Sequence, residues 1–256
     1  VAGWYGGGDG QRYSALTPSR ILDTRAGNGA PQATLGAGAA MTLQVTGRGG
    51  VPATGVSAVV LNVTVTDTAS GGWLAAWPAG EPLPLASNLN YVAGQTVPNL
   101  VMVKVGAGGA VNLYSSGGPI NVIADVAGYY GDTGAGLATA TPARILDTRS
   151  GLGAPQAKVA PGIPMSLQVS GRGGVPATGV SAVVLNVTVT EPATGGWLAA
   201  WPAGEPLPVV SNLNYVPGQT VPNLVVVKVG TDGKVNLYSS GGPVHVIADV
   251  AGWFTT

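Results

Sequence analysis

The chain has 256 residues, of which 9% are charged, and its 11 Lys and Arg are balanced by 11 Asp and Glu. A chain without net charge exerts no long-range attraction on phosphate backbones or anionic lipids, so we expect neither nucleic acid nor a membrane surface as a partner. No apolar stretch approaches the roughly 18 residues that a membrane-spanning helix needs, so no membrane insertion is expected. The absence of cysteine excludes disulfides and thiolate metal sites.

Short alternating segments follow one another along the chain. "MTLQVTG" at 41–47 and "SAVVLNVTVT" at 57–66 place apolar side chains at every second position, which is the pattern of a half-buried strand. "WLAAWPA", "NLNYV", "PNLVMVKV", "AVNLYSS" and "INVIADVAGYY" continue the series to residue 130. With 42 Gly and 20 Pro for tight turns and no helix of useful length, the sequence predicts an all-β fold.

The second half of the chain nearly repeats the first, with a shift of 124 residues. Of the 40 positions from Val45 to Pro84, only four differ from their counterparts. We therefore expect two tandem modules, 1–130 and 131–256, each a β-sandwich or closed barrel of about eight to nine short antiparallel strands. "VAGWYG" at 1–6 matches the end of a module, which suggests either a segment of a longer repeat protein or a strand that completes a neighbour.

"RILDTR" at 20–25 and again at 144–149 concentrates charge in a chain that has little of it. Strict strand alternation places Asp23 and Arg25 on one face, opposite Arg20, with Arg48 of "GRGG" as a third partner. Such a group more plausibly ties a strand to a loop than performs chemistry. The predicted structural ion-pair residues of the two modules are Arg20, Asp23, Arg25, Arg48, Arg144, Asp147, Arg149 and Arg172.

Catalytic groups are scarce. The only histidine, His245, is replaced by Asn121 in the first module, which argues against a Ser-His nucleophile. The carboxylates shared by both modules offer no pair suited to glycoside hydrolysis, since Asp23 has arginine neighbours that lower its pKa. No cluster has metal-ligand spacing. We expect no enzyme, no cofactor and no metal, with a glycoside-acting enzyme as a remote alternative.

The aromatic and amide residues give a different indication. Trp73 and Trp77 share one strand face, separated by Ala75, and Asn88 and Asn90 lie on the next strand. Two indoles can form an apolar platform, and amides can donate to and accept from hydroxyls, as sugar binding requires. The alternative is that the tryptophans pack in the core or between modules. The candidate ligand-binding residues are Trp73, Trp77, Asn88, Asn90, Tyr91, Trp197, Trp201, Asn212, Asn214 and Tyr215.

Lys104 and Lys228 occupy strands in which the alternate residues are valine. One interpretation is a buried lysine cross-linked to an asparagine by an isopeptide bond. The ordinary alternative is that the lysine stem covers apolar surface while its ammonium group reaches water.

The blocks "TPSRILDTR", "GRGGVP", "VVLNVTVT", "SNLNY", "GQTVPNLV" and "VIADVAGYY" together resemble β-repeat modules of secreted and cell-surface proteins of high-GC Gram-positive bacteria. The resemblance covers both modules and implies export and a role beside other extracellular domains. We therefore expect a secreted or cell-surface, non-catalytic module that binds a glycan or cell-wall polysaccharide, with one site per module. The other candidate is a structural spacer or self-associating surface protein.

Overall fold

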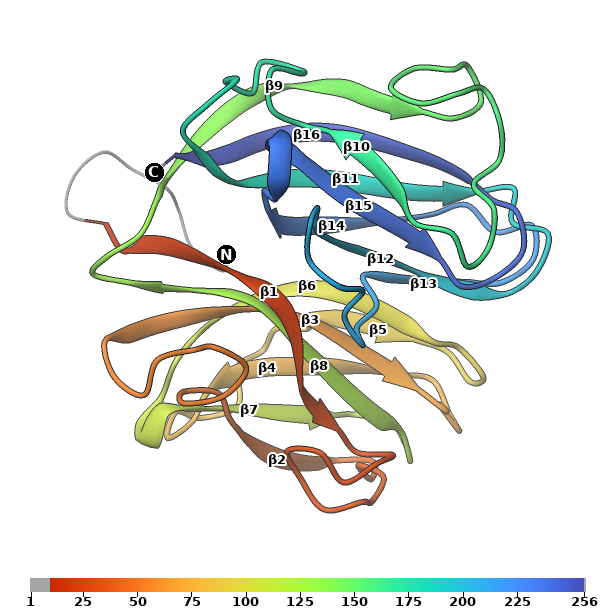
Figure 1. Ribbon diagram of the computed structural model, residues 1–256. Helices are drawn as coiled ribbons and strands as arrows, with labels where there is room; N and C mark the ends of the chain where they lie inside the picture. Colours follow the sequence, from red (N-terminus) through yellow and green to blue (C-terminus); the bar gives the residue numbers. More distant parts are fainter. Residues whose placement is uncertain (1–9, 256) are drawn as a thin grey trace. The chain divides into compact units, whose positions relative to one another are not determined.

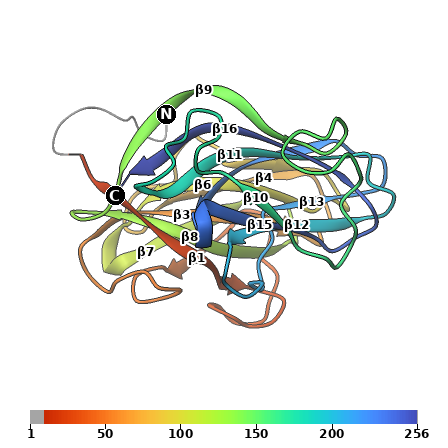
Figure 2. The same cartoon turned by 45° about the horizontal axis from the view of Figure 1, so that its top comes forward.

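The computed structural model describes residues 10–255, and in this range the chain is all-β, with sixteen strands and two short 3-10 turns. It forms two compact units, the first ending at Thr133 and the second beginning at Gly134, here called module 1 and module 2. Each module is a sandwich of two four-stranded antiparallel sheets (Figures 1 and 2). The expected all-β tandem sandwich is confirmed. The motif "VAGWYG" lies outside the described residues.

Module 1 contains eight strands: β1 (Arg12–Asp23), β2 (Ala39–Gln44), β3 (Val56–Thr66), β4 (Gly72–Pro78), β5 (Leu89–Tyr91), β6 (Val97–Lys104), β7 (Ala110–Ser115) and β8 (Asn121–Gly131). One sheet has the order β1-β8-β3-β6 and the other the order β2-β7-β4-β5. We call the first the clamp sheet and the second the aromatic sheet.

Module 2 repeats this arrangement with β9 (Gly136–Asp147), β10 (Met165–Gln168), β11 (Val180–Thr190), β12 (Gly196–Pro202), β13 (Leu213–Tyr215), β14 (Val221–Lys228), β15 (Lys234–Ser239) and β16 (His245–Thr255). Its clamp sheet has the order β14-β11-β16-β9 and its aromatic sheet the order β10-β15-β12-β13. The 3-10 turns η1 (Ala107–Gly109) and η2 (Thr231–Gly233) precede β7 and β15.

The core of each module lies between its two sheets, where the alternating apolar residues meet. In β3, Val59, Leu61, Val63 and Val65 are fully buried and pack in one cluster with residues of the opposite sheet such as Leu113. Burial of each such side chain contributes roughly 1.5–3 kcal/mol before the cost of ordering the chain. The period-2 pattern therefore determines which face of each strand looks inward.

The "GRGG" motif is explained by a close approach of backbone to core. Gly49 has a positive φ of 57°, and a Cβ atom there would lie 2.7 Å from side-chain atoms of both Ile21 and Val126. Gly173 occupies the same position in module 2, with a φ of 56°. Only glycine fits this position without strain, so the motif shapes the loop that covers the end of the core.

Each clamp sheet carries a proline in the edge strand formed by β6 or β14. Among the described residues β6 pairs only with β3 and has Pro98 opposite Thr64, and β14 has Pro222 opposite Thr188. Proline is tolerated on an edge strand where its nitrogen faces away from the paired strand.

Across residues 10–255 the structure contains no helix long and apolar enough to cross a membrane.

Candidate functional site

A β-bulge in β1 gathers the charges of "RILDTR" on one side of the clamp sheet. The register shifts between Arg20 and Leu22, so Ile21 and Leu22 both face the core. Arg20 therefore lies on the same outer side as Asp23, which strict alternation would forbid. Our assignment of Arg20 to the opposite face was wrong for this reason.

The clamp is a chain of four charged groups. Arg20 donates from Nε to Asp125 Oδ1 at 2.8 Å and from Nη1 to Asp23 Oδ2 at 3.3 Å. Arg25 forms a bidentate ion pair with Asp23: its Nε donates to Oδ1 at 2.9 Å and its Nη2 donates to Oδ2 at 2.8 Å. The hydrogen bonds from Arg25, together with its charge, lower the pKa of Asp23 despite burial.

Module 2 reproduces this clamp with Arg144, Asp147, Arg149 and Asp249. The bidentate contact of Arg149 is the main cause that lowers the pKa of Asp147 to about 2. An aspartate held so firmly in the ionised form is unsuited to donate a proton in glycoside hydrolysis.

Arg48 and Arg172 are not part of the clamp, contrary to expectation. Arg48 donates to the side-chain oxygen of Asn28 at 3.2 Å, in the loop after β1. Module 2 has Leu152 in place of Asn28, and no ion pair or side-chain hydrogen bond involves Arg172 within residues 10–255. The missing partner of the clamp is instead Asp125, from the "VIADVAGYY" block, so the two most specific blocks of the sequence meet in space.

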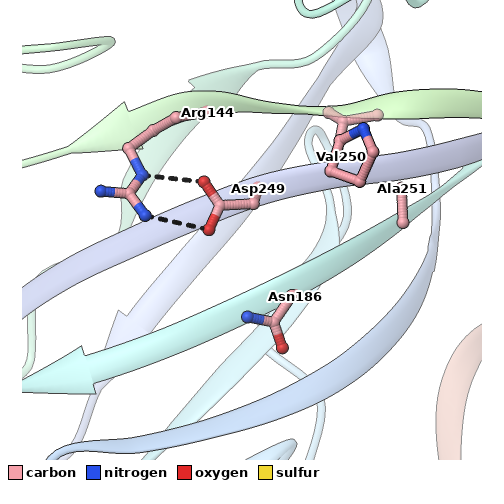
Figure 3. A pocket seen from close by; sticks show the side chains of 6 residues that line it. Arg144, Asn186, Asp249, Val250 and Ala251 are labelled. Carbon is pink, nitrogen blue, oxygen red and sulfur yellow. Dashed lines mark hydrogen bonds and ion pairs between the residues drawn. The ribbon is translucent and has the colours of Figure 1, made fainter.

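The clamp of module 2 borders a shallow hollow of about 520 Å³ on the outer face of the sheet. Figure 3 shows Arg144 facing Asp249 through two hydrogen bonds, with Asn186 on the neighbouring strand. The two charged groups that line this hollow, Arg144 and Asp249, are paired with each other. Their interaction joins two neighbouring strands of the sheet and leaves neither charge free for a ligand.

The aromatic sheet presents a different surface. Trp73 of β4 and Tyr114 of β7 project from the outer face with ring centroids 5.1 Å apart and planes tilted by 43°. Trp197 and Tyr238 form the same pair in module 2, at 5.2 Å and 39°. All four side chains are half-buried. Each aromatic sheet thus presents a tilted aromatic pair on its outer face, which is an apolar surface of fixed geometry.

The predicted platform of two indoles does not form, because Trp77 and Trp201 are covered. Each lies on the outer face of its strand, but the following turn folds back over it, and Nε1 donates to the backbone oxygen of Glu81 or Glu205 at 2.9 Å. Their residual exposure is only 6% and 1%. These two indoles stabilise the turn and are not available to a ligand.

Four further candidates have structural roles. Asn88 and Asn212 accept from the backbone N–H of Ala76 and Ala200, and so close the strand edge. Tyr91 and Tyr215 point into the core, where each hydroxyl is hydrogen-bonded to Ser115 or Ser239. Buried polar groups that already have partners gain nothing from an external ligand.

Polar groups with unused hydrogen-bonding capacity surround the aromatic pair. Asn90, directly opposite Trp73, is exposed and forms no side-chain hydrogen bond among the described residues, whereas Asn214, in the same place opposite Trp197, is half-buried and its Oδ1 accepts from Ser211 Oγ at 3.4 Å. Asn112 accepts from Thr42 through Oδ1, which leaves its NH₂ group open. Within residues 10–255, the Trp73 indole N–H and the Tyr114 hydroxyl have no hydrogen-bond partner.

Sequence reasoning missed Tyr114, Asn112, Tyr238 and Asn236. The alternation of "AVNLYSS" already placed Asn112 and Tyr114 on one strand face. Which strand they would join was hidden, because β4 and β7 are separated by β5 and β6 in the chain and pair only through the sandwich topology.

Two minor hypotheses were also decided by geometry. Lys104 is 72% exposed at its side chain and its ammonium group lies 3.2 Å from Glu81, so it is not a buried lysine facing an asparagine. His245 Nδ1 forms a hydrogen bond with Thr148 Oγ1 at 2.9 Å, and in module 1 Asn121 Oδ1 accepts from Thr24 Oγ1 at the same distance. The histidine therefore replaces a structural amide at the end of its strand.

No group of three or more potential metal ligands occurs within the described part of the chain.

Neither protein-family models nor curated proteins give a match to the sequence. Among solved structures, the N-terminal CBM22-1-CBM22-2 tandem domain from Paenibacillus barcinonensis Xyn10C is 11% identical, with a TM-score of 0.26 over 93% of this chain and 99% of that one. The STIV MCP is 9% identical, with a TM-score of 0.22 over 95% and 96%. Scores this low say nothing about the function of the chain.

Proposed function

We propose that the chain is a non-catalytic carbohydrate-binding protein with one site on the outer face of each aromatic sheet. The observation that carries this proposal is the Trp73–Tyr114 pair with its unpartnered donors, repeated as Trp197–Tyr238 in module 2. The site differs from the one expected from the sequence: Trp73 and Asn90 remain in it, and Tyr114 and Asn112 join them.

The surface suits a sugar because a pyranose ring has apolar faces and polar edges. The tilted pair offers ring surface to the C–H face of a sugar, while Asn90 and Asn112 flank it with amide groups that can bind hydroxyls. The outer positions of β2, β7, β4 and β5 in module 1 carry no charged side chain. A neutral hydroxyl-rich ligand matches that character.

Rigid presentation favours binding by such a small surface. Both aromatic residues stand on paired strands, and the Trp73 backbone N–H is fixed by Ser116 Oγ at 2.9 Å. A site ordered before binding avoids the cost of freezing its side chains when the ligand arrives. Two equivalent sites on one chain also raise avidity for a polymer when both engage it.

The proposed location is outside the cell, in keeping with the resemblance to repeat modules of secreted and cell-surface proteins. A glycan or a cell-wall polysaccharide is then the ligand that the chain would meet at this location.

Binding stoichiometry tests the proposal. Calorimetric titration with a panel of neutral oligosaccharides is expected to give two sites per chain, one site after Trp73→Ala or Trp197→Ala, and none after both. Leu224→Ala, on the outer face of a clamp sheet, serves as the control and should keep two sites. Failure of every glycan to bind, or full binding by the double variant, would refute the proposal.

A structural spacer is the second candidate, and one observation favours it: four of the six predicted aromatic site residues, Trp77, Tyr91 and their counterparts, stabilise the fold itself. A spacer would keep its melting temperature and lose no measurable binding when Trp73 and Trp197 are replaced. The same titration therefore separates the two candidates.

A further inference from the structure

We propose that the two sites select different sugars, a neutral residue in module 1 and an anionic residue in module 2, and that Lys234 makes the difference. This inference rests on the proposed function and concerns the ligand class of each site. It starts from a difference between two similar surfaces that places a charge on the outer face of one aromatic sheet, Ala110 in module 1 and Lys234 in module 2.

Lys234 stands in the same outer row as the aromatic site. It is the first residue of β15 and pairs with Gln168, while Asn236 pairs with Ser166. Because Leu237 and Val235 face the core, Lys234, Asn236 and Tyr238 share the outer face. Four residues of strand separate Lys234 from Tyr238 by about 13 Å, and the flexible lysine side chain shortens that gap. A short oligosaccharide lying along β15 would span it.

The ammonium group of Lys234 is uncommitted within residues 10–255, where no ion pair or hydrogen bond involves it. The other lysines have partners: Lys104 and Lys228 pair with Glu81 and Glu205, and Lys158 donates to a backbone oxygen. A free cation on a binding face attracts an anionic group without first breaking an internal pair.

Asp232 is the other charge that distinguishes this end of module 2, where module 1 has Gly108. It is exposed in the turn η2, before the strand begins, and forms no ion pair with Lys234. Its carboxylate therefore lies off the end of the sheet, while Lys234 belongs to the sheet face. Substituting Asp232 separately tests whether it weakens the selectivity.

The anionic group could be the carboxylate of a uronic acid or a phosphate on the sugar, and the shared chemistry is a single negative charge about two residues along the glycan. Lysine suits either source because its ammonium is a compact point charge without the planar fork of arginine. A pair formed at an exposed surface raises affinity only a few-fold and weakens with salt.

The experiment isolates each site within the full chain. Trp73→Ala leaves only the module 2 site, and Trp197→Ala leaves only the module 1 site. Dissociation constants are measured at low salt for a neutral oligosaccharide, its uronate counterpart and its phosphorylated counterpart. We expect the Trp73→Ala chain to prefer an anionic ligand about 2- to 5-fold and the Trp197→Ala chain to show no such preference.

Further variants assign the effect. Lys234→Ala in the Trp73→Ala chain should abolish the preference while leaving affinity for the neutral ligand unchanged, and Asp232→Gly should increase the preference. The preference should also fade as salt is added. Whichever anionic ligand shows the larger preference identifies the source of the charge.

Three results would overturn the inference, and they differ in what else they refute. Equal affinity for neutral and anionic ligands in the Trp73→Ala chain, or a preference that survives Lys234→Ala, refutes the role of Lys234 while the glycan sites stand. Absence of binding to all three ligands by both single-site chains removes the proposed function and this inference together.

Discussion

The two outer faces of each module differ in whether their charged and polar side chains have partners within the protein. On the clamp sheet, Arg20, Asp23, Arg25 and Asp125 are bound to one another, and the carboxylates are almost fully buried. On the aromatic sheet, the Trp73 indole, the Tyr114 hydroxyl and the Asn90 amide find no partner within the described residues. Paired charges on one face contribute stability, whereas open hydrogen-bonding groups on the other face have bonds left to make with a ligand.

This contrast assigns different consequences to substitutions on the two faces. Changes on the clamp sheet should lower the melting temperature, and changes on the aromatic sheet should lower glycan affinity. The duplication supplies a control in every experiment, because the untouched module reports on the same chain in the same solution.

The largest effect is expected from Asp23→Ala. Removal of the carboxylate leaves Arg20 and Arg25 without their shared partner and should lower the free energy of unfolding of module 1 by about 3 kcal/mol. Calorimetry should show one transition moving to lower temperature while that of module 2 stays. An unchanged melting curve would show that the clamp does not support the fold and would break the contrast.

Acid should weaken the clamp sheets next. The pKa of Asp147 is about 2 in the folded state, below the ordinary value of an aspartate, so its contribution is fully present above about pH 4. As the pH falls from about 4 to 2, protonation removes this stabilisation, on the order of 1–2 kcal/mol. Thermal unfolding followed across this range should show the loss, and Asp147→Asn should flatten it for module 2.

Lys104→Ala should have a small effect. Lys104 of the clamp sheet reaches Glu81 in the turn beside the aromatic sheet, but both side chains are mostly exposed. Solvent screens such a pair, so the free energy of unfolding should fall by no more than about 0.5 kcal/mol. Chemical denaturation measures the difference, and a loss several times larger would mean that the pair ties the two sheets together.

Tyr114→Phe should leave stability unchanged, to within about 0.5 kcal/mol, because the hydroxyl it removes has no partner among the described residues. The ring pair with Trp73 is preserved. Affinity of module 1 for a glycan, measured in the Trp197→Ala chain, should nevertheless fall. A destabilised protein with unaltered affinity would reverse the roles assigned to the two faces.

The sequence predicted the fold well because local pattern and duplication carry that information. Period-2 alternation in "SAVVLNVTVT" identified which valines face the core, and the repeat identified two modules. The bulge at Ile21 escaped this reasoning, since one inserted residue reverses the alternation without any mark in the residue types. For that reason alone Arg20 was assigned to the face opposite Asp23, whereas the predicted pairing of Asp23 with Arg25 agrees with the structure.

The candidate site was only half predictable. Trp73 and Asn90 were found because alternation places them outward, and the same rule also selected Trp77. Its burial depends on the turn at Glu81 folding back over the ring, which is a tertiary event. Tyr114 was missed because the pairing of β7 with β4 joins segments that are distant in the chain.

Pro98 and Pro222 affect how copies of this chain interact with one another at high local concentration. An exposed edge strand is a template on which a strand of another molecule can add and continue the sheet. On β6 and β14 the proline removes one N–H from that template, which weakens the edge as a docking site for an added strand. β6 and β14 are therefore poor templates for strand addition between copies of this chain.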